Sequence, residues 1–288
     1  MVTDALWRDV NGDGRLDLVV VGEWMPITIF RNMGGGRLEK MNVPGLEKSD
    51  GWWNRVIAGD FTGDGRVDFI VGNLGLNSRL KAEANEPATM YVKDFAHNGF
   101  VQQIISYYNQ GRAYPLTLRD DLIRSLTFLK DRYLNYKDYA KQTVADVFPQ
   151  KDLADAVVKN AYTFATTLVR NNGDGTFTMV PLPTEAQLSP VYGIYATDFN
   201  GDGKPDLLLA GNFDGVKPEI GKMDAGYGLY LRGDGKGNFT PVREVESGFL
   251  VPGQARDIQP VRTRKGNIYV VARNNDRPLV FRASGRAK

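Results

Sequence analysis

Three nine-residue segments of the chain have almost the same sequence, and each is rich in aspartate and glycine. They read DVNGDGRLD at 9–17, DFTGDGRVD at 60–68 and DFNGDGKPD at 198–206. Each is followed by an apolar run that ends at Gly22, Gly72 or Gly211, a pattern typical of a buried strand. Each is also preceded by a short segment of strand-like composition. The repeated unit is therefore a strand, an acidic loop and a second strand.

A hairpin follows each of these units. Its turn carries glycines at 34–36, 173–175 and 233–237, which suit the positive φ angles of tight hairpin turns. Each unit thus contains four strands, and four-stranded units repeated along a chain are typical of a β-propeller. We therefore predict an all-β fold.

The spacing between loop and hairpin predicts where the chain is interrupted. It is 25 residues from Asp9 to Gly34 and 35 from Asp198 to Gly233, but 113 from Asp60 to Gly173. Removing residues 74–160 reduces the last spacing to 26, so we interpret 74–160 as an insertion. The predicted organisation is propeller blades over 1–73, the insertion over 74–160 and further blades over 161–288. In an alternative interpretation, a decayed loop at 94–99 opens a separate blade.

The last blade is predicted to be incomplete. Strand-like segments at 255–261, 267–272 and 278–281 supply three strands, and no fourth is predicted after them. Only the residues Met1 to Asp4 precede the first strand, too few to provide the missing one. We therefore expect a partial propeller of about four blades, and we expect its unpaired edges to promote association.

The insertion has a different pattern. Residues 90–95 and 101–108 could form a hairpin, and helical periodicity follows at Leu122, Ile123, Leu126, Leu129 and Tyr133. Apolar residues over 139–148 and 153–161 suggest two further helices. We predict a hairpin followed by a mainly helical cap.

The acidic loops carry the oxygen ligands that a hard dication requires. Calcium takes six to eight oxygens, and side chains at loop positions 1, 3, 5 and 9 with the carbonyl of position 7 could supply them. The candidate ligands are Asp9, Asn11, Asp13, the carbonyl of Arg15 and Asp17; Asp60, Thr62, Asp64, the carbonyl of Arg66 and Asp68; and Asp198, Asn200, Asp202, the carbonyl of Lys204 and Asp206. We predict about three Ca²⁺ sites, the second weakened by Thr62. The loop at Asp94 has Ala96 and Gln102 at ligand positions and is expected to hold no tight site.

Composition excludes several other classes of function. The chain has no cysteine, which excludes disulfide scaffolds and thiolate chemistry, and its single histidine, His97, leaves little room for a catalytic triad. A net charge of +2 argues against nucleic-acid binding. No apolar run reaches the roughly 20 residues of a membrane span, and no signal peptide is visible.

The repeated units resemble FG-GAP/VCBS repeats, the calcium-loop blades of integrin α-chain propellers. The whole chain resembles the C-terminal part of bacterial VCBS repeat proteins that carry an ASPIC/UnbV domain, a segment not visible here. The resemblance rests on VVGEWMP at 20–26, GWWN at 51–54, VGNLGLNS at 71–78, YPL at 114–116 with RDD at 119–121, QLSPVYG at 187–193 and RNND at 273–276. It implies a propeller of about seven blades, the first of them upstream of Met1. It also implies an extracellular, cell-surface or periplasmic location.

These patterns predict a non-catalytic calcium-binding module for binding or adhesion. Its expected partners are an unknown protein or glycan ligand and the upstream blades of the same parent protein. The alternative is a polysaccharide-active, lyase-like enzyme. The residues that could serve it are Tyr107, Tyr108, Arg112, Arg119, Asp120 and Asp121.

Overall fold

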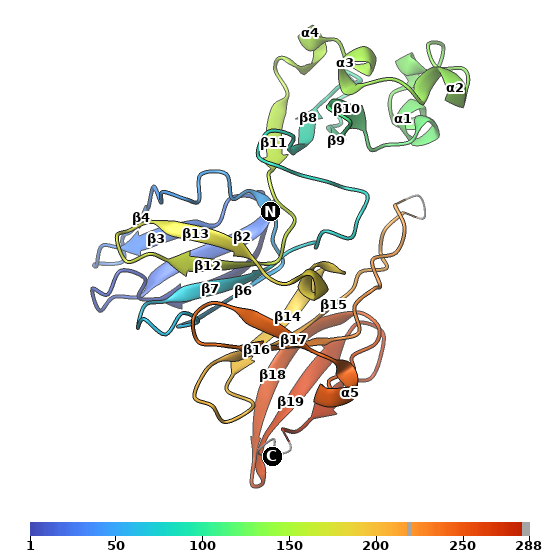
Figure 1. Ribbon diagram of the computed structural model, residues 1–288. Coiled ribbons are helices and arrows are strands. Elements are labelled where there is room, and N and C mark those ends of the chain that lie inside the picture. Colours follow the sequence, from blue (N-terminus) through green and yellow to red (C-terminus); the bar gives the residue numbers. More distant parts are fainter. Residues whose placement is uncertain (218–219, 284–288) are drawn as a thin grey trace. The chain divides into compact units, whose positions relative to one another are not determined.

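The computed structural model describes residues 1–217 and 220–283 of the chain. Within these ranges the chain consists of strands in antiparallel sheets with a few short helices, so the predicted all-β class is confirmed. The chain divides into two compact units, Met1–Arg79 with Phe164–Lys288 and Leu80–Thr163. We call them the propeller unit and the inserted unit and describe each by itself (Figure 1). None of the helices in the described ranges is long and apolar enough to span a membrane.

The first blade of the propeller unit is a sheet whose main strands follow one another in chain order. Its strands are β1 (Val2–Arg8), β2 (Asp17–Met25), β3 (Thr28–Asn32) and β4 (Leu38–Lys40), and β5 (Gly51–Trp52) pairs with β2. Leu6 pairs with Val19, which in turn pairs with Ile29. Because paired residues share a face, this row lies on one side of the sheet, where it joins the core next to the second blade.

The second blade is interrupted by the inserted unit. Its strands are β6 (Arg55–Gly59), β7 (Asp68–Gly72), β12 (Thr167–Asn171) and β13 (Phe177–Pro181), in the order β13-β12-β7-β6. The chain leaves this sheet after β7 and returns at β12, where Val169 pairs with Phe69. The unit that begins at Asp60 thereby obtains both of its outer strands.

The third and fourth blades follow without interruption. The third contains β14 (Val191–Thr197), β15 (Asp206–Gly211), β16 (Leu229–Gly233) and β17 (Phe239–Val242), flanked by the helices η2 (Thr184–Gln187) and α5 (Glu244–Ser247). The fourth contains β18 (Ala255–Thr263), β19 (Gly266–Arg273) and β20 (Leu279–Phe281). Within the described residues this last sheet has three strands.

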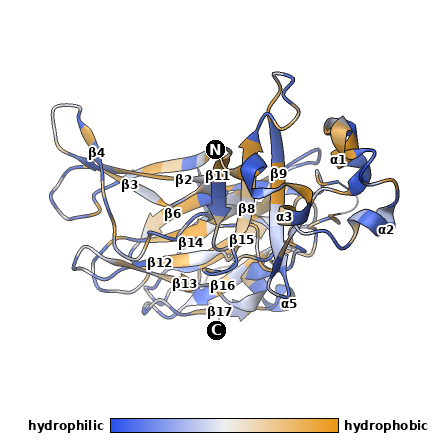
Figure 2. Ribbon diagram, turned by 90° about the horizontal axis from the view of Figure 1, so that it is seen from above, coloured by the Kyte–Doolittle hydropathy of each residue, from blue (hydrophilic) through white to orange (hydrophobic). Residues whose placement is uncertain are grey.

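Successive blades pack through the first strand of each sheet. β1 lies against β6, β6 against β14, and β14 against β18. The second strands of the second and third blades, β7 and β15, are buried along their whole length, which explains their continuous apolar runs. In β15, for example, Leu209 faces the core shared with the second blade, whereas Leu208 faces the fourth. In Figure 2 the hydrophobic colour accordingly appears along β15. The arrangement is that of a β-propeller.

The inserted unit is a four-stranded sheet with short helices. Its strands are β8 (Ala88–Lys93), β9 (Gln102–Asn109), β10 (Arg112–Pro115) and β11 (Val157–Ala161), in the order β10-β9-β8-β11. Its helices are α1 (Arg119–Ser125), η1 (Thr127–Leu129), α2 (Tyr136–Tyr139), α3 (Val144–Val147) and α4 (Gln150–Leu153). The expected hairpin is present, because Met90 pairs with Ile105.

The expectation of a mainly helical insertion is wrong in two places. The third predicted helix is largely strand β11, in which the β-branched Val157 pairs with Val92 of β8. The first breaks at Leu126, whose φ of −121° and ψ of 77° are not helical. Leu122, Leu126, Leu129 and Tyr133 are nevertheless all buried in one core. The periodicity therefore predicted burial correctly but overestimated the length of the helix.

One face of the first blade carries exposed apolar side chains. Trp7 pairs with Leu18, which pairs with Phe30, and the indole of Trp7 is 51% exposed. We expect the isolated chain to self-associate through this face, because a contiguous apolar surface on a sheet favours contact with another molecule. Trp7→Lys should lower the apparent mass measured by light scattering at high concentration. Met33→Lys, at a residue 44% exposed in a hairpin turn, is the control. A parent chain that remains monomeric at every concentration contradicts this expectation.

Candidate metal centre

The three acidic loops connect the first two strands in three successive blades and have the same backbone. Loop 1 (9–17) joins β1 to β2, loop 2 (60–68) joins β6 to β7, and loop 3 (198–206) joins β14 to β15. The glycines at positions 4 and 6 have positive φ in all three loops, for example 75° at Gly12 and 81° at Gly14. Residues other than glycine rarely adopt these backbone angles, so the repeated glycines determine the conformation of the turn.

Position 1 points into the loop and is held by backbone amides. In loop 3 the Oδ1 of Asp198 accepts hydrogen bonds from the amides of positions 4 and 5, at 2.7 and 3.2 Å, and its Oδ2 accepts one from Gly203 at 2.8 Å. Asp9 and Asp60 accept the equivalent amides. The Gly203 amide, with its neighbours, lowers the pKa of Asp198. This carboxylate is therefore ionised and already oriented.

Position 5 provides a second carboxylate held by a backbone amide. The Oδ1 atoms of Asp13, Asp64 and Asp202 accept hydrogen bonds from the amides of position 7, at 3.0, 2.9 and 2.9 Å. Burial opposes ionisation of Asp13 and Asp64, but hydrogen bonds from the position 7 amide and from neighbouring side chains outweigh it and lower the pKa of both.

Position 3 differs between the loops. The Oδ1 of Asn11 and of Asn200 accepts the amide hydrogen bond of position 5, at 3.0 and 2.8 Å. In loop 2 the hydroxyl of Thr62 donates to Oδ2 of Asp68 at 3.0 Å. Loop 2 therefore has a hydroxyl at position 3, where loops 1 and 3 have an amide oxygen.

Position 9 has a structural role that the sequence pattern did not reveal. Asp17, Asp68 and Asp206 are completely buried. In each, Oδ2 accepts the amide of position 2 at 3.1 Å. The other oxygen accepts an amide at the end of the third strand, from Asn32, Asn171 or Gly233, at 2.8 to 2.9 Å. Burial raises the pKa of Asp68. The position 9 carboxylate thus fastens the loop to its blade.

The loop at 94–102 repeats this framework but keeps a carboxylate only at position 1, where Asp94 accepts the amides of Asn98 and Gly99 at 3.1 and 2.8 Å. The amide of Phe95 donates to Oε1 of Gln102 at 2.8 Å, where the acidic loops use a buried aspartate. Asn98 replaces the position 5 aspartate and accepts the Phe100 amide at 3.0 Å. His97 adopts a φ of 51° at a glycine position. The alternative interpretation of this segment as a decayed loop therefore agrees with its hydrogen bonding, although the loop lies in the inserted unit.

The chemistry of the donor sets fits a hard cation such as calcium. Each acidic loop carries two carboxylates at positions 1 and 5 and could add the backbone carbonyl of position 7, and loops 1 and 3 also have an amide oxygen at position 3. No three acidic or histidine side chains converge within the described ranges, because the position 9 carboxylate turns to its two amides. An ion would have to use the second lone pairs of those oxygens. The ligand assignments remain predictions.

The residues considered for an enzyme are occupied in structural contacts. The guanidinium of Arg119 donates to the carbonyls of Tyr133 and Leu134, both at 2.7 Å, and pairs with Asp120. Tyr136 donates to the same Asp120 at 2.7 Å. Tyr107 and Tyr114 are backbone pairing partners across β9 and β10. The contacts of Arg119, Asp120 and Tyr136 hold this part of the inserted unit together.

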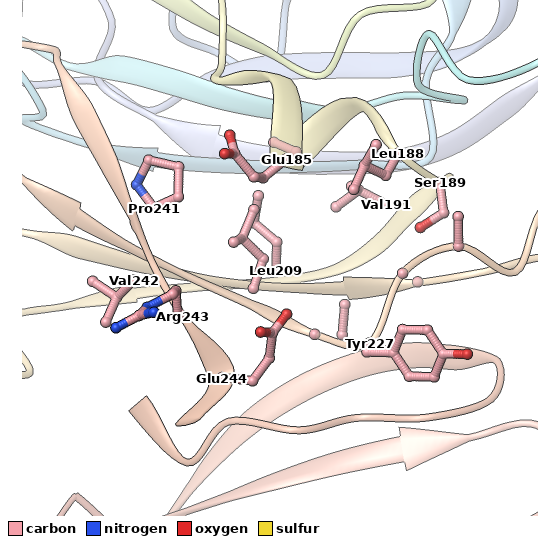
Figure 3. Close-up of a pocket in the computed structure, with 17 residues that line it drawn as sticks. Glu185, Leu188, Ser189, Val191, Leu209, Tyr227, Pro241, Val242, Arg243 and Glu244 are labelled. Atoms are coloured by element: carbon pink, nitrogen blue, oxygen red, sulfur yellow. The ribbon is translucent and has the colours of Figure 1, made fainter. Parts of the chain in front are cut away.

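A pocket of about 230 Å³ lies in the third blade, between η2, β15 and the segment that ends β17. Leu209 and Val191 form part of its apolar floor, and the carboxylates of Glu185 and Glu244 lie at its rim with Ser189 (Figure 3). Sequence reasoning did not predict this pocket, since its residues come from segments outside the repeated loops. It combines an apolar surface with hydrogen-bond acceptors.

Comparison with known proteins identifies the repeats. The model of a family described as the FG-GAP-like repeat matches residues 9–71 and 155–209, which contain all three acidic loops. Among solved structures, the chain is similar to an Agrocybe aegerita lectin described by its specific recognition of non-reducing terminal N-acetylglucosamine, with 17% identity and a TM-score of 0.29. The match covers 99% of this chain and 64% of the lectin, so the chain spans less than two thirds of its length. A search of curated proteins found no match.

Proposed function

We propose that this chain, an FG-GAP-like repeat protein over residues 9–71 and 155–209, is a calcium-binding β-propeller module that binds a ligand without catalysis. The observation that carries the proposal is the common framework of loops 1 to 3. Each holds carboxylates at positions 1 and 5 in one orientation, whereas the loop at 94–102 keeps the same framework with neutral side chains at positions 5 and 9. Because this turn forms with Asn98 at position 5, the position 5 carboxylates of loops 1 to 3 serve another purpose than folding.

The residues toward calcium are the predicted ones. Positions 1 and 5 would supply carboxylate oxygens, position 3 an amide or hydroxyl oxygen, and position 7 its carbonyl. Position 9 would add the remaining lone pairs of Asp17, Asp68 or Asp206. Bound calcium would neutralise carboxylates that repel each other and would brace the loop between two strands. Extracellular calcium modules bind with dissociation constants of about 10⁻⁴ to 10⁻³ M, which suits a protein outside the cytoplasm, at a cell surface or in a periplasm.

The ligand is proposed to be a protein or a glycan. The pocket beside Glu185 and Glu244 supports this, because an apolar floor with acceptors at its rim suits a ligand that has both apolar faces and hydroxyl or amino groups. The exposed apolar face at Trp7 supports a second partner, namely further blades of the same parent protein. A glycan array probed with and without calcium distinguishes a glycan ligand from a protein ligand.

Counting bound calcium in variants tests the metal sites. Asp13→Ala and Asp202→Ala should each remove about one calcium per chain, because each deletes a central carboxylate. Thr62→Ala should remove less, since its hydroxyl already donates to Asp68. Equilibrium dialysis at fixed free calcium gives the count. An equal loss in all three variants contradicts the assigned ligand sets, and no bound calcium in the parent contradicts the proposal.

A further inference from the structure

The loops differ in the cation that lies beside the position 5 carboxylate. In loop 1 the guanidinium of Arg15, at position 7, donates to Oδ2 of Asp13 at 2.7 Å through Nη2. Its Nε donates to the carbonyl of Asn32, at the end of the third strand, at 2.8 Å. The arginine therefore bridges the loop carboxylate and the strand. A second guanidinium also contacts this carboxylate, because Nη2 of Arg31 lies 3.3 Å from Oδ2 of Asp13.

Loop 2 repeats this bridge. The guanidinium of Arg66 pairs with Asp64 through Nη2, and its Nε donates to the carbonyl of Asn171 at 3.1 Å. Gly173 leaves room for it, since a Cβ there would lie 3.0 Å from the guanidinium carbon. The two bridges are thus the same arrangement in two blades.

Loop 3 has lysine at position 7 and a different arrangement. Oδ1 of Asp202 accepts the Lys204 amide, and its Oδ2 accepts Nδ2 of Asn200 at 3.2 Å. In the part of the chain that the structure describes, no ion pair joins the Lys204 ammonium to Asp202. The lysine stem lies instead beside Gly235, where an added Cβ would be 3.1 Å from Cγ.

We propose that Arg15 and Arg66 act as internal counter-cations that compete with calcium for the position 5 carboxylates, so that loop 3 binds calcium most tightly. This inference rests on the proposed calcium binding. An entering ion must share or displace a guanidinium that already neutralises the carboxylate and is anchored to the strand. In loop 3 it meets a carboxylate with only neutral donors.

The size of the effect follows from the exposure of the pairs. The side chains of Arg15 and Asp13 are 44% and 20% exposed, and those of Arg66 and Asp64 are 38% and 24% exposed. Partly exposed ion pairs are weakened by solvent, so we expect each arginine to weaken calcium binding about two- to fivefold. When calcium falls, loops 1 and 2 would empty first and keep an ordered carboxylate through their arginines.

Reciprocal substitutions at position 7 test the inference. Loops 1 and 3 both have asparagine at position 3, so Arg15→Lys and Lys204→Arg exchange the position 7 cation between two comparable loops. Each substitution is made in a variant in which position 5 of the other two acidic loops is changed to asparagine, so that only one loop can bind calcium. Asparagine is chosen because Asn98 occupies position 5 of the loop at 94–102. Loop 1 is isolated by Asp64→Asn with Asp202→Asn, and loop 3 by Asp13→Asn with Asp64→Asn. Calorimetric titration with calcium chloride then reports one site at a time.

The expected result is that Arg15→Lys tightens loop 1 about two- to fivefold and Lys204→Arg weakens loop 3 by a similar factor. Arg37→Lys, which replaces the arginine of an exposed pair with Glu39 in the first blade, should change neither constant. Arg15→Lys should also lower the melting temperature in chelator, because the bridge is lost. Calcium binding with constants that the exchanges do not alter overturns this inference alone. No calcium binding by either isolated loop or by the parent overturns the proposed function as well.

Discussion

Ten millimolar calcium is expected to raise the melting temperature of the chain by about 5 to 10 °C over its value in chelator, even if only one loop is filled with a Kd of about 10⁻⁴ M. A ligand that binds the native state alone stabilises it by about 2.7 kcal/mol at a hundredfold excess over Kd. For a domain of this size, 1 kcal/mol shifts the melting temperature by about 2 to 4 °C. Loops 1 to 3 together should give a larger rise. Thermal melts followed by circular dichroism measure it.

Magnesium at the same concentration is the control for this prediction. Magnesium requires near-octahedral geometry and releases its water reluctantly, so mixed loop ligands favour calcium. We expect a smaller rise with magnesium than with calcium. Identical melts in chelator and in calcium would contradict the calcium sites.

The second large effect is expected at the buried position 9. Asp68→Asn should destabilise the chain by about 1 to 3 kcal/mol even in chelator. Two backbone amides donate to different oxygens of Asp68, and asparagine has only one acceptor oxygen, so one amide would be left without a partner. Asp68 is fully buried and accepts hydrogen bonds from Asn171 and Phe61 at 2.8 and 3.1 Å. Urea unfolding in chelator measures the change.

Asp64→Asn is the matched control, since it removes one carboxylate from the same loop. Asp64 is partly exposed in its pair with Arg66, so its exchange should reduce calcium binding while lowering the stability in chelator by less than about 1 kcal/mol. Equal destabilisation by the two variants in chelator would contradict the separation of a structural position 9 from a metal-facing position 5.

The blades could be predicted from the sequence because the signals for each blade lie close together in the chain. An apolar run that ends at Gly22, Gly72 or Gly211 is close in sequence to the loop before it and the hairpin after it. The pairing of β2 with both β1 and β3 follows directly from those short connections. The all-β class and the repeat family follow from the same pattern, and both are supported by the structure and the family match.

The inserted unit could not be predicted to the same extent because its sheet depends on distant contacts. β11 pairs with β8 across the whole set of short helices, and no local pattern announces that pairing. The apolar spacing of Leu122, Leu126 and Leu129 is satisfied by burial, whether or not the helix is continuous. Periodicity reports which side chains are buried more reliably than it reports the backbone between them.

The role of position 9 was missed for a related reason. An aspartate at the end of an acidic loop has the composition of a metal ligand, and only the structure shows that its oxygens meet the amides of Val10 and Asn32. A sequence signal did exist. The loop that begins at Asp94 keeps an acceptor at the same position, Gln102, although it has lost the oxygen ligand of position 3 and the carboxylate of position 5. Retention of an acceptor without charge indicates a structural contact.

Anomalous diffraction from crystals of the chain grown in millimolar calcium tests the central claim most directly. We predict one calcium peak in each of loops 1 to 3, with oxygens of positions 1 and 5 within about 2.3 to 2.6 Å of it. We predict no peak in the loop at 94–102, whose ligand positions carry Ala96 and Gln102. The absence of a peak from all three acidic loops would contradict the account.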